Sequence, residues 1–490
     1  MKIAVLPLDS RPCTSLFAPQ LCKLAGAEVF TPPREILGFF KQPSDQAKII
    51  AWLEGIAPHA DVLVVCIEQL LYGGLIQSRT NERGEESCLR ILDVLRKIKM
   101  RHPQLRILAN NILMRTTISV VDEQSAKWWA LVSKFSHLSY LLSVSVDSER
   151  ERIKTELHTI QDQIPEHVLS QFFAARQRNH HVNMRCIELV KEEVLDQLLI
   201  LQEDSDKEGI QWIEQQAIHS TIEQSGLEEK VFLHNGTDEA AIEQALLATY
   251  LPSRRQIQVQ WLSSNVGFTA RYEDRPFLQN LHGHLRAMQM DSAEDANDCL
   301  FILPPKSVQG DYCPQPVCFD GYTQAEYRAM ADAVAAAYHA GKHCYLLDLS
   351  YANGGDLDFM MALCDRMPLI ALYGYAAWNT ASNSLGTILG QIVAAHGANL
   401  PKNQVFTAER ILDDLVYQGL IRSSLEKILR SEGIDVWNLI DMDRANELLA
   451  QEFDKALPVL ERLFDGQVPP FLAKLDWPRT FEVEIFLQKV

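Results

Sequence analysis

The sequence predicts an α/β protein built from parallel βαβ units, and three observations support this. Short apolar runs recur along the chain, each run ends in polar or glycine-rich sequence, and amphipathic stretches separate the runs. Strands in such proteins are continuously apolar because helices cover both faces of a parallel sheet. We expect an N-terminal barrel-like or distorted barrel lobe, a second, smaller Rossmann-like α/β lobe and a helical C-terminal region.

The elements follow this order along the chain. The runs 2–8, 61–67, 105–109, 196–202 and 230–234 are predicted strands of the first lobe, and residues 148–191 are a charged helical excursion from it. The runs 255–262, 298–305, 343–350 and 368–374 are predicted strands of the second lobe. From about Pro401 the apolar spacing is helical. The expected domains are therefore 1–252, 253–400 and 401–490.

Composition narrows the classes of partner. The formal charge is −18, whereas binding to nucleic acid or anionic membranes needs clustered lysine and arginine, so we expect neither partner. The ten cysteines are scattered and match no zinc spacing, which favours reduced thiols and a cytoplasmic protein. The N-terminal run is a predicted strand rather than a signal peptide. We expect a small-molecule or oligosaccharide substrate and no cofactor, with a divalent metal left open.

Two pairs of neighbouring acids follow predicted strands and are the candidate catalytic groups. Glu203 and Asp204 come directly after the run 196–202, and Asp238 and Glu239 come shortly after 230–234. Two carboxyl groups in one pocket can acquire different pKa values, so that one keeps its proton while the other is ionised. Glycosidases depend on this division of roles. The alternative is a solvated loop whose acids cap the following helices.

Amide, aromatic and charged side chains at the other strand ends are the candidate substrate-binding groups. Amides both donate and accept hydrogen bonds, and an indole offers a flat apolar face with an N–H at its edge, so the set suits a polyhydroxylated ligand. A structural Asp9–Arg11 salt bridge and helix capping near Asn383 are the alternatives. The set comprises Asp9, Arg11, Glu68, Tyr72, Arg79, Asn111, Arg115, Arg178, Asn179, Asn235, Asn353, Asp356, Trp378, Asn379 and Asn383.

These strand-end motifs together resemble a bacterial family catalogued as domain of unknown function 4127. In chain order they are PLDSRP, EQLLYGGLIQSR, ARQRNHHVN, QEDSDKEG, GTDEA, YANGGD, YAAWNTASNSLGT and WPRTFE, and they cover nearly the whole chain. Where the family pattern usually has Gln-Asp-Asp, this chain has Gln202-Glu203-Asp204, which moves the first carboxylate outward. The resemblance implies no established activity, so the chemistry has to come from the residues.

The residues favour a glycoside hydrolase-like enzyme that acts on a polyhydroxylated sugar, N-acetylated sugars included, through paired carboxylates. The adjacent acids are similar, by analogy, to those of some hexosaminidase barrels, where one acid orients the substrate acetamide and the next protonates the leaving oxygen. A first alternative is a metal-dependent carbohydrate or phosphoester enzyme with Asp9, Glu68, Asp204 and Asp238 as ligands of a hard cation. A second alternative is a non-catalytic sugar-binding protein.

Overall fold

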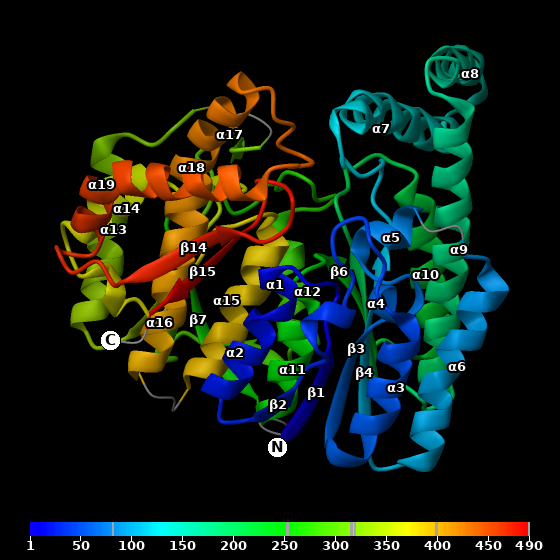
Figure 1. Ribbon diagram of the computed structural model, residues 1–490, viewed down its shortest axis with the longest axis horizontal. Helices are drawn as coiled ribbons and strands as arrows, with labels where there is room; N and C mark the ends of the chain where they lie inside the picture. The colour runs from blue at the N-terminus through cyan, green and yellow to red at the C-terminus, as the bar shows by residue number, and fades with distance from the viewer. Residues whose placement is uncertain (81–82, 251–253, 314–316, 318–319, 397–399, 489–490) are drawn as a thin grey trace. The chain divides into compact units, whose positions relative to one another are not determined.

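The computed structural model describes residues 1–80, 83–250, 254–313, 317, 320–396 and 400–488 (Figure 1). The chain divides into two compact units. Unit 1 comprises Met1–Ser15, Ala27–Ala245 and Tyr272–Asp274, and unit 2 comprises Leu16–Gly26, Leu246–Arg271 and Arg275–Val490. Each unit contains its own parallel sheet.

Unit 1 is built on a six-stranded sheet in the order β2-β1-β3-β4-β5-β6, and every neighbouring pair is parallel. Parallel pairing requires crossover helices, and strands covered on both faces become apolar throughout, as in β3, where all five residues are buried. The strand order reverses direction at β1, so the ends of β1 and β3 flank a topological switch point, where ligands commonly bind in open α/β sheets. The strands are β1 (Lys2–Leu6), β2 (Glu28–Phe30), β3 (Val62–Cys66), β4 (Arg106–Leu113), β5 (Gln197–Gln202) and β6 (Val231–Asn235).

Helices pack their apolar sides on one face of this sheet. The buried residues of that face include Leu63, Val65, Ile107 and Ala109, which alternate along β3 and β4 and contact side chains of α3, α4, α6, α9 and α10. The helices that begin in unit 1 are α1 (Pro12–Ser15), η1 (Arg34–Ile36), α3 (Gln46–Ile56), η2 (Ala57–His59), α4 (Ile67–Leu71), α5 (Leu75–Thr80), α6 (Glu85–Arg101), α7 (Glu123–Val144), α8 (Asp147–Gln161), α9 (Glu166–Lys191), α10 (Gln211–Ser225) and α11 (Ala240–Tyr250).

Helices α7, α8 and the first half of α9 form a small helical subassembly with a hydrophobic cluster of its own, which includes Val132, Phe135, Ile153, Ile160 and Phe172 (Figure 1). Helices α8 and α9 correspond to the helical excursion that the sequence predicts between residues 148 and 191, whereas α7 (Glu123–Val144) lies before its expected bounds. Its long final helix, α9, returns to the sheet and contacts β4 and β5. The excursion therefore ends by delivering polar side chains of α9 to the sheet.

Unit 2 contains a five-stranded parallel sheet in the order β13-β11-β9-β7-β8. A short parallel pair, β10-β12, and an antiparallel hairpin, β14-β15, accompany it. The strands are β7 (Arg255–Trp261), β8 (Met290–Ser292), β9 (Asp298–Leu303), β10 (Gly310–Asp311), β11 (His343–Asp348), β12 (Tyr351–Ala352), β13 (Gly374–Ala376), β14 (Phe471–Leu475) and β15 (Val483–Leu487).

The helices of unit 2 include one wide turn region. Residues Ile411–Ile421 form a π-helix, η4, between two α-helices, and π-helical segments are rare and are often found at functional sites. None of the described helices of either unit is long and apolar enough to cross a membrane. The other helices are α2 (Phe17–Leu24), α12 (Phe277–Ala287), α13 (Gln324–His339), α14 (Leu357–Cys364), η3 (Leu369–Ala371), α15 (Ala381–Ala395), α16 (Leu400–Arg410), α17 (Arg422–Ser431), α18 (Met442–Lys455) and α19 (Leu457–Leu463).

The structure confirms the α/β class and the parallel βαβ units. Among the described residues β2 and β6 each pair with one neighbour, so the sheet of unit 1 is open rather than a closed barrel. The expected boundary at 252–253 lies outside the described residues, and residues 401–488 belong to unit 2. The predicted strand 368–374 is wrong: Leu369–Ala371 form the 3-10 turn η3 with Pro368 as its N-cap, and only Gly374–Ala376 pairs with β11.

Candidate functional site

Polar side chains gather beyond the carboxyl ends of the unit 1 strands. Since all six strands are parallel, their carboxyl ends lie at one edge of the sheet. The predicted residues that follow β1, β3, β5 and β6 therefore share this edge. They are Asp9, Arg11, Glu68, Glu203, Asp204, Asn235, Asp238 and Glu239.

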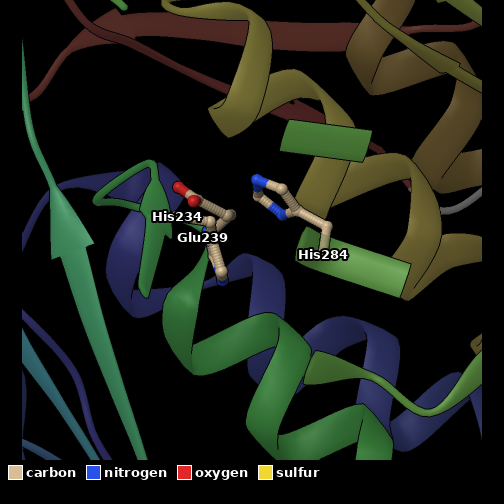
Figure 2. Close-up of side chains that lie close together, drawn as sticks. All are labelled: His234, Glu239 and His284. Carbon is tan, nitrogen blue, oxygen red and sulfur yellow. The ribbon is translucent and has the colours of Figure 1, made fainter. Parts of the chain in front are cut away.

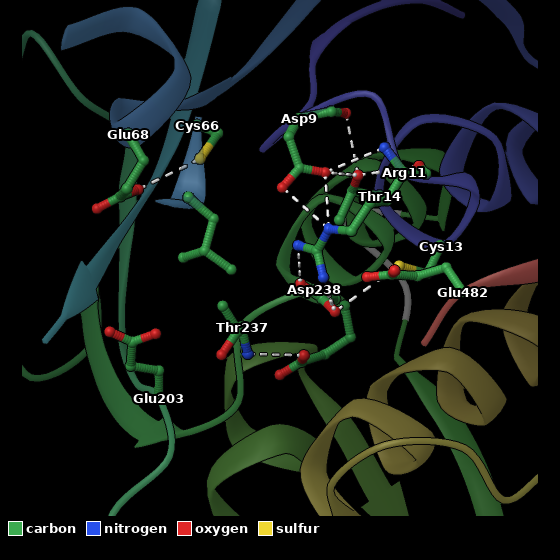
Figure 3. Close-up of polar contacts among 12 residues, drawn as sticks. Asp9, Arg11, Cys13, Thr14, Cys66, Glu68, Glu203, Thr237, Asp238 and Glu482 are labelled. Carbon is green, nitrogen blue, oxygen red and sulfur yellow. Dashed lines mark hydrogen bonds and ion pairs between the residues drawn. The ribbon is translucent and has the colours of Figure 1, made fainter. Parts of the chain in front are cut away.

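Arg11, at the turn between β1 and α1, is held between two buried acids (Figure 3). Its Nε donates to both carboxylate oxygens of Asp9 at 2.9 and 3.0 Å. Its Nη1 and Nη2 donate to Asp238 at 3.0 and 2.7 Å, and Thr14 Oγ1 donates to Asp9 at 2.8 Å. The Asp9–Arg11 salt bridge weighed from the sequence is confirmed, and Asp238 is its third member. Both acids therefore compensate the charge of a buried guanidinium group.

Glu203 is fixed by two donors at the end of β5. Arg79, at the end of α5, contacts both of its carboxylate oxygens, through Nη2 and, at 3.2 Å, through Nε. The backbone N–H of Arg115 donates to Oε1 at 2.8 Å. The Arg115 side chain in turn pairs with Asp204, whose side chain is 32 % exposed while that of Glu203 is 2 % exposed. The partners of Glu203 are therefore a guanidinium group and a backbone N–H.

Glu68 has different surroundings at the end of β3. Its Oε1 accepts from the Ile112 N–H at 2.8 Å, and its Oε2 accepts from the Cys66 thiol at 3.3 Å. No lysine or arginine pairs with it in the described part of the chain. Burial raises the pKa of Glu68 from 4.5 to about 7, and the negative charge of Glu203 adds to this shift. Glu68 and Glu203 are therefore neighbouring carboxyl groups in contrasting electrostatic surroundings (Figure 3).

A second buried group of ionisable residues lies where β6 passes into α11 (Figure 2). The Glu239 carboxylate accepts from the Thr237 N–H at 2.8 Å, and His234 Nε2 lies 3.5 Å from Glu243. Burial and the Glu243 charge raise the pKa of Glu239, and burial raises that of Glu243 to about 7. Glu239 thus accepts a hydrogen bond within the turn before α11. It is 1 % exposed, so it does not belong to a solvated loop.

Polar residues of α9 donate hydrogen bonds to the backbone next to Arg79 and Arg115. Arg178 stacks on the Tyr72 ring at 4.3 Å and, together with Asn179, donates to the Ser78 carbonyl, which precedes Arg79. Arg176 donates to the carbonyls of Met114 and Arg115. The predicted binding residues Tyr72, Arg178 and Asn179 are therefore positioned to orient Arg79.

Two predicted amides have partners inside unit 1. Asn111 lies within β4, which runs on to Leu113, and its amide donates to Asn183 of α9 at 2.5 Å. The strand continues because Asn111 faces α9, where a polar partner satisfies it. Asn235 ends β6 and donates to Ser205 Oγ at 3.2 Å, which joins the loops after β5 and β6.

The remaining predicted residues belong to unit 2. Asp356 caps α14 through the Phe359 N–H and accepts from Tyr327 Oη at 2.7 Å. The cap of α15 is Thr380, whose Oγ1 accepts from the Asn383 N–H, so the capping role weighed for Asn383 falls to Thr380. Asn353, Trp378 and Asn379 follow the ends of β12 and β13.

Sequence reasoning missed several buried polar residues. Asp348 ends β11, and burial together with Asp356 raises its pKa to about 7; its place at a strand end was a usable signal. Cys66 also ends a strand and donates to Glu68. Asp414, on the π-helix, accepts from the Ala377 N–H, and Arg422 lies just after it. Nothing in the local pattern marks these two, because the segment has ordinary helical spacing.

Comparison with known proteins identifies a family and no function. Residues 3–486 match the family described as "Protein of unknown function (DUF4127)". No curated protein and no solved structure matches the chain.

Proposed function

Since the chain belongs to this family of unknown function, we propose a function from its residues: hydrolysis of a glycosidic bond by carboxyl groups at the carboxyl edge of the unit 1 sheet. The substrate class is a polyhydroxylated sugar, with N-acetylated sugars included. A cytoplasmic location remains part of this proposal, and it rests on the scattered cysteines.

The observation that carries the proposal is the contrast between Glu68 and Glu203. Glu203 contacts a guanidinium group and an N–H donor, whereas Glu68 is buried beside it without a cation among the described residues. Such a pair can divide the two roles of a glycosidase, with Glu68 as the proton donor and Glu203 as the base or nucleophile. Asp204, the most exposed acid of the group, lies on the solvent side and suits contact with a sugar hydroxyl.

The metal-dependent alternative receives less support from the same contacts. Of its four candidate ligands, Asp9 and Asp238 already face Arg11, and Asp204 faces Arg115. A guanidinium group competes with a metal cation for the same oxygens. The acid–base proposal requires no change in the contacts of Glu68 and Glu203.

The test is a hydrolysis assay of the full chain on a panel of aryl glycosides that includes N-acetylated sugars. The parent should cleave at least one member, and Glu68→Gln and Glu203→Gln should each lower kcat by about 10²–10⁴-fold. The matched control is Glu86→Gln, an exposed glutamate of α6 whose replacement should leave the rate unchanged. Cleavage of no glycoside, or wild-type rates in both folded variants, would overturn the proposal.

The pH profile provides a second readout. If Glu68 is the proton donor, turnover should fall as pH rises through about 7, where this group loses its proton. Thermal stabilisation by sugars without turnover would instead favour the non-catalytic sugar-binding protein.

A further inference from the structure

The loops after two strands of unit 2, which belong to different sheets, are held in an uncommon backbone conformation. Asn353, after β12, and Asn379, after β13, have positive φ angles of 61° and 68°. The Asn353 N–H donates to the Asn379 carbonyl at 2.9 Å, so the two loops are joined. Residues other than glycine adopt this conformation at a cost, and such residues cluster at ligand sites. Trp378 immediately precedes one of them.

Trp378 is anchored through its backbone but not through its indole N–H. Its carbonyl accepts from Ser384 Oγ at 2.8 Å, and the neighbouring Ala377 N–H donates to Asp414 of the π-helix at 2.9 Å. The side chain is buried, with 7 % of the residue exposed, and its ring centroid lies 5.5 Å from that of Phe481. Its Nε1 has no hydrogen-bond partner in the described part of the chain.

Arg422 is a second buried side chain with an N–H group that lacks an acceptor in the part of the chain that the structure describes. It follows the π-helix, is 2 % exposed, and lies with its guanidinium carbon 5.3 Å from the Phe481 ring. Its Nη1 donates to Gln418 at 2.7 Å and its Nε lies 3.8 Å from Glu426, but its Nη2 has no partner among the described residues. Arg479, which also lies over Phe481, is paired with Glu482.

Two buried donors without acceptors, both on side chains that pack on Phe481, require an explanation. Native proteins leave very few buried N–H groups unpaired, because each such group loses its bonds to water. Both free positions donate, and one belongs to a permanent cation, so the missing partner is an acceptor and preferably an anion. The adjoining aromatic rings offer apolar faces of the kind that sugars contact.

We propose that Trp378, Arg422 and Phe481, here called the Phe481 group, bind the carboxylate of a sugar acid. The carboxylate accepts from the indole N–H and from Arg422 Nη2, and the sugar ring lies against the aromatic side chains. The group unites two motifs that hydrolysis in unit 1 does not use, YAAWNTASNSLGT and WPRTFE. This site is independent of the proposed hydrolysis, because all of its residues belong to unit 2.

The test is isothermal titration of the full chain with sodium D-glucuronate, D-glucose and sodium acetate. Glucuronate should bind at least ten-fold more tightly than glucose or acetate, because it alone combines the carboxylate with the ring. Absence of glucuronate binding up to about 10 mM, or affinity no higher than that of glucose, would overturn the proposal. Equal affinity for acetate would overturn the sugar part of it.

Two variants locate the binding. Trp378→Phe keeps a ring and removes the N–H, and it should weaken glucuronate binding about 5–10-fold. Arg422→Met should remove the preference for glucuronate over glucose. Trp437→Phe, a half-buried tryptophan of the same unit, is the control and should change nothing. Thermal melting checks the fold of each variant. If Arg422→Met does not fold, unchanged affinity in Trp378→Phe still overturns the proposal. Binding retained in Glu203→Gln would separate this site from hydrolysis.

Discussion

Arg11 and Asp238 are joined by two hydrogen bonds of 2.7 and 3.0 Å although they stand 227 positions apart in the chain. Their strands, β1 and β6, are separated in the sheet by β3, β4 and β5. Four strand spacings amount to about 19 Å. The loops after β1 and β6 therefore reach toward each other across the carboxyl edge. Glu68 and Glu203, at the ends of the strands between them, are 2 % and 3 % exposed.

Removal of the cation in this bridge should strongly destabilise the protein. Arg11→Met leaves Asp9 and Asp238 buried without their partner, and breaking a buried ion pair in this way costs about 3–5 kcal/mol. Urea unfolding at pH 7 measures the loss. The control is Arg90→Met, which breaks an exposed pair with Glu86 and should cost no more than about 0.5 kcal/mol. Equal effects of the two variants would contradict the buried bridge.

Glu68 should make the free energy of unfolding depend on pH. Burial raises its pKa from 4.5 to about 7, so the folded protein holds this proton more tightly than the unfolded chain. The stabilisation from this group is therefore greatest at low pH, falls as pH rises from about 4.5 to about 7, and stays constant above. Glu68→Gln should exceed the parent in stability by about 1–3 kcal/mol at pH 8 and lose this advantage below about pH 5.

Urea unfolding across this pH range, with parent and variant side by side, tests the assignment. Glu243, Asp348 and Asp414 also have raised pKa values, so only the difference between the two proteins isolates Glu68. Glu86→Gln is the exposed control and should follow the parent. A difference that is the same at pH 5 and pH 8 would refute a raised pKa for Glu68.

Two glycines should respond to alanine in opposite directions. A Cβ at Gly38 would lie 1.9 Å from the Gly73 carbonyl oxygen, so the backbone would have to move and Gly38→Ala should cost about 2–4 kcal/mol. Gly55 lies in α3 with nothing within 4 Å of an added Cβ. Gly55→Ala should therefore stabilise the protein by about 0.5–1 kcal/mol through helix propensity. Thermal melting of the two variants measures both effects, and a tolerated Gly38→Ala would show that Gly38 does not lie against the Gly73 carbonyl.

The overall charge predicts behaviour on polyanionic supports. With a formal charge of −18, the protein should pass unretained through heparin and DNA columns at physiological salt. Retention there would reveal a local basic surface and contradict the expectation that nucleic acid is not a partner.

The sequence predicted the sheet edges better than the roles of the side chains on them. Apolar runs such as Val62–Cys66 locate the strands, because a strand that is buried on both faces consists almost entirely of apolar residues. Parallel pairing then brings Asp9, Glu68, Glu203 and Asp238 to one edge. Whether an acid at that edge is paired or isolated depends on partners such as Arg11, which alternation along one strand cannot supply.

The roles of other residues could not be predicted because their partners come from distant elements. Asn111 read as the start of a loop, yet the strand continues since Asn183 of α9 satisfies its amide. Arg422 and Trp378 lie on separate elements, and only tertiary packing brings both of them to Phe481. Long-range pairs of this kind leave no periodic trace in a single sequence.

The π-helix η4 makes one stretch of unit 2 unusually sensitive to chain length. Asp413 and Gln418, five positions apart, are hydrogen-bonded along this segment at 3.4 Å. Deletion of one residue between Ile411 and Ile421 would let the backbone return to α-helical pairing, but each residue of an α-helix turns by about 100°. In a deletion, the lost residue and the tighter α-helical winding change the rotation of Arg422 in opposite directions. An inserted residue has no such compensation and would turn Arg422 away from the face that meets Phe481. A substitution in this stretch changes one side chain, whereas an insertion alters the angular position of every residue that follows it in the helix.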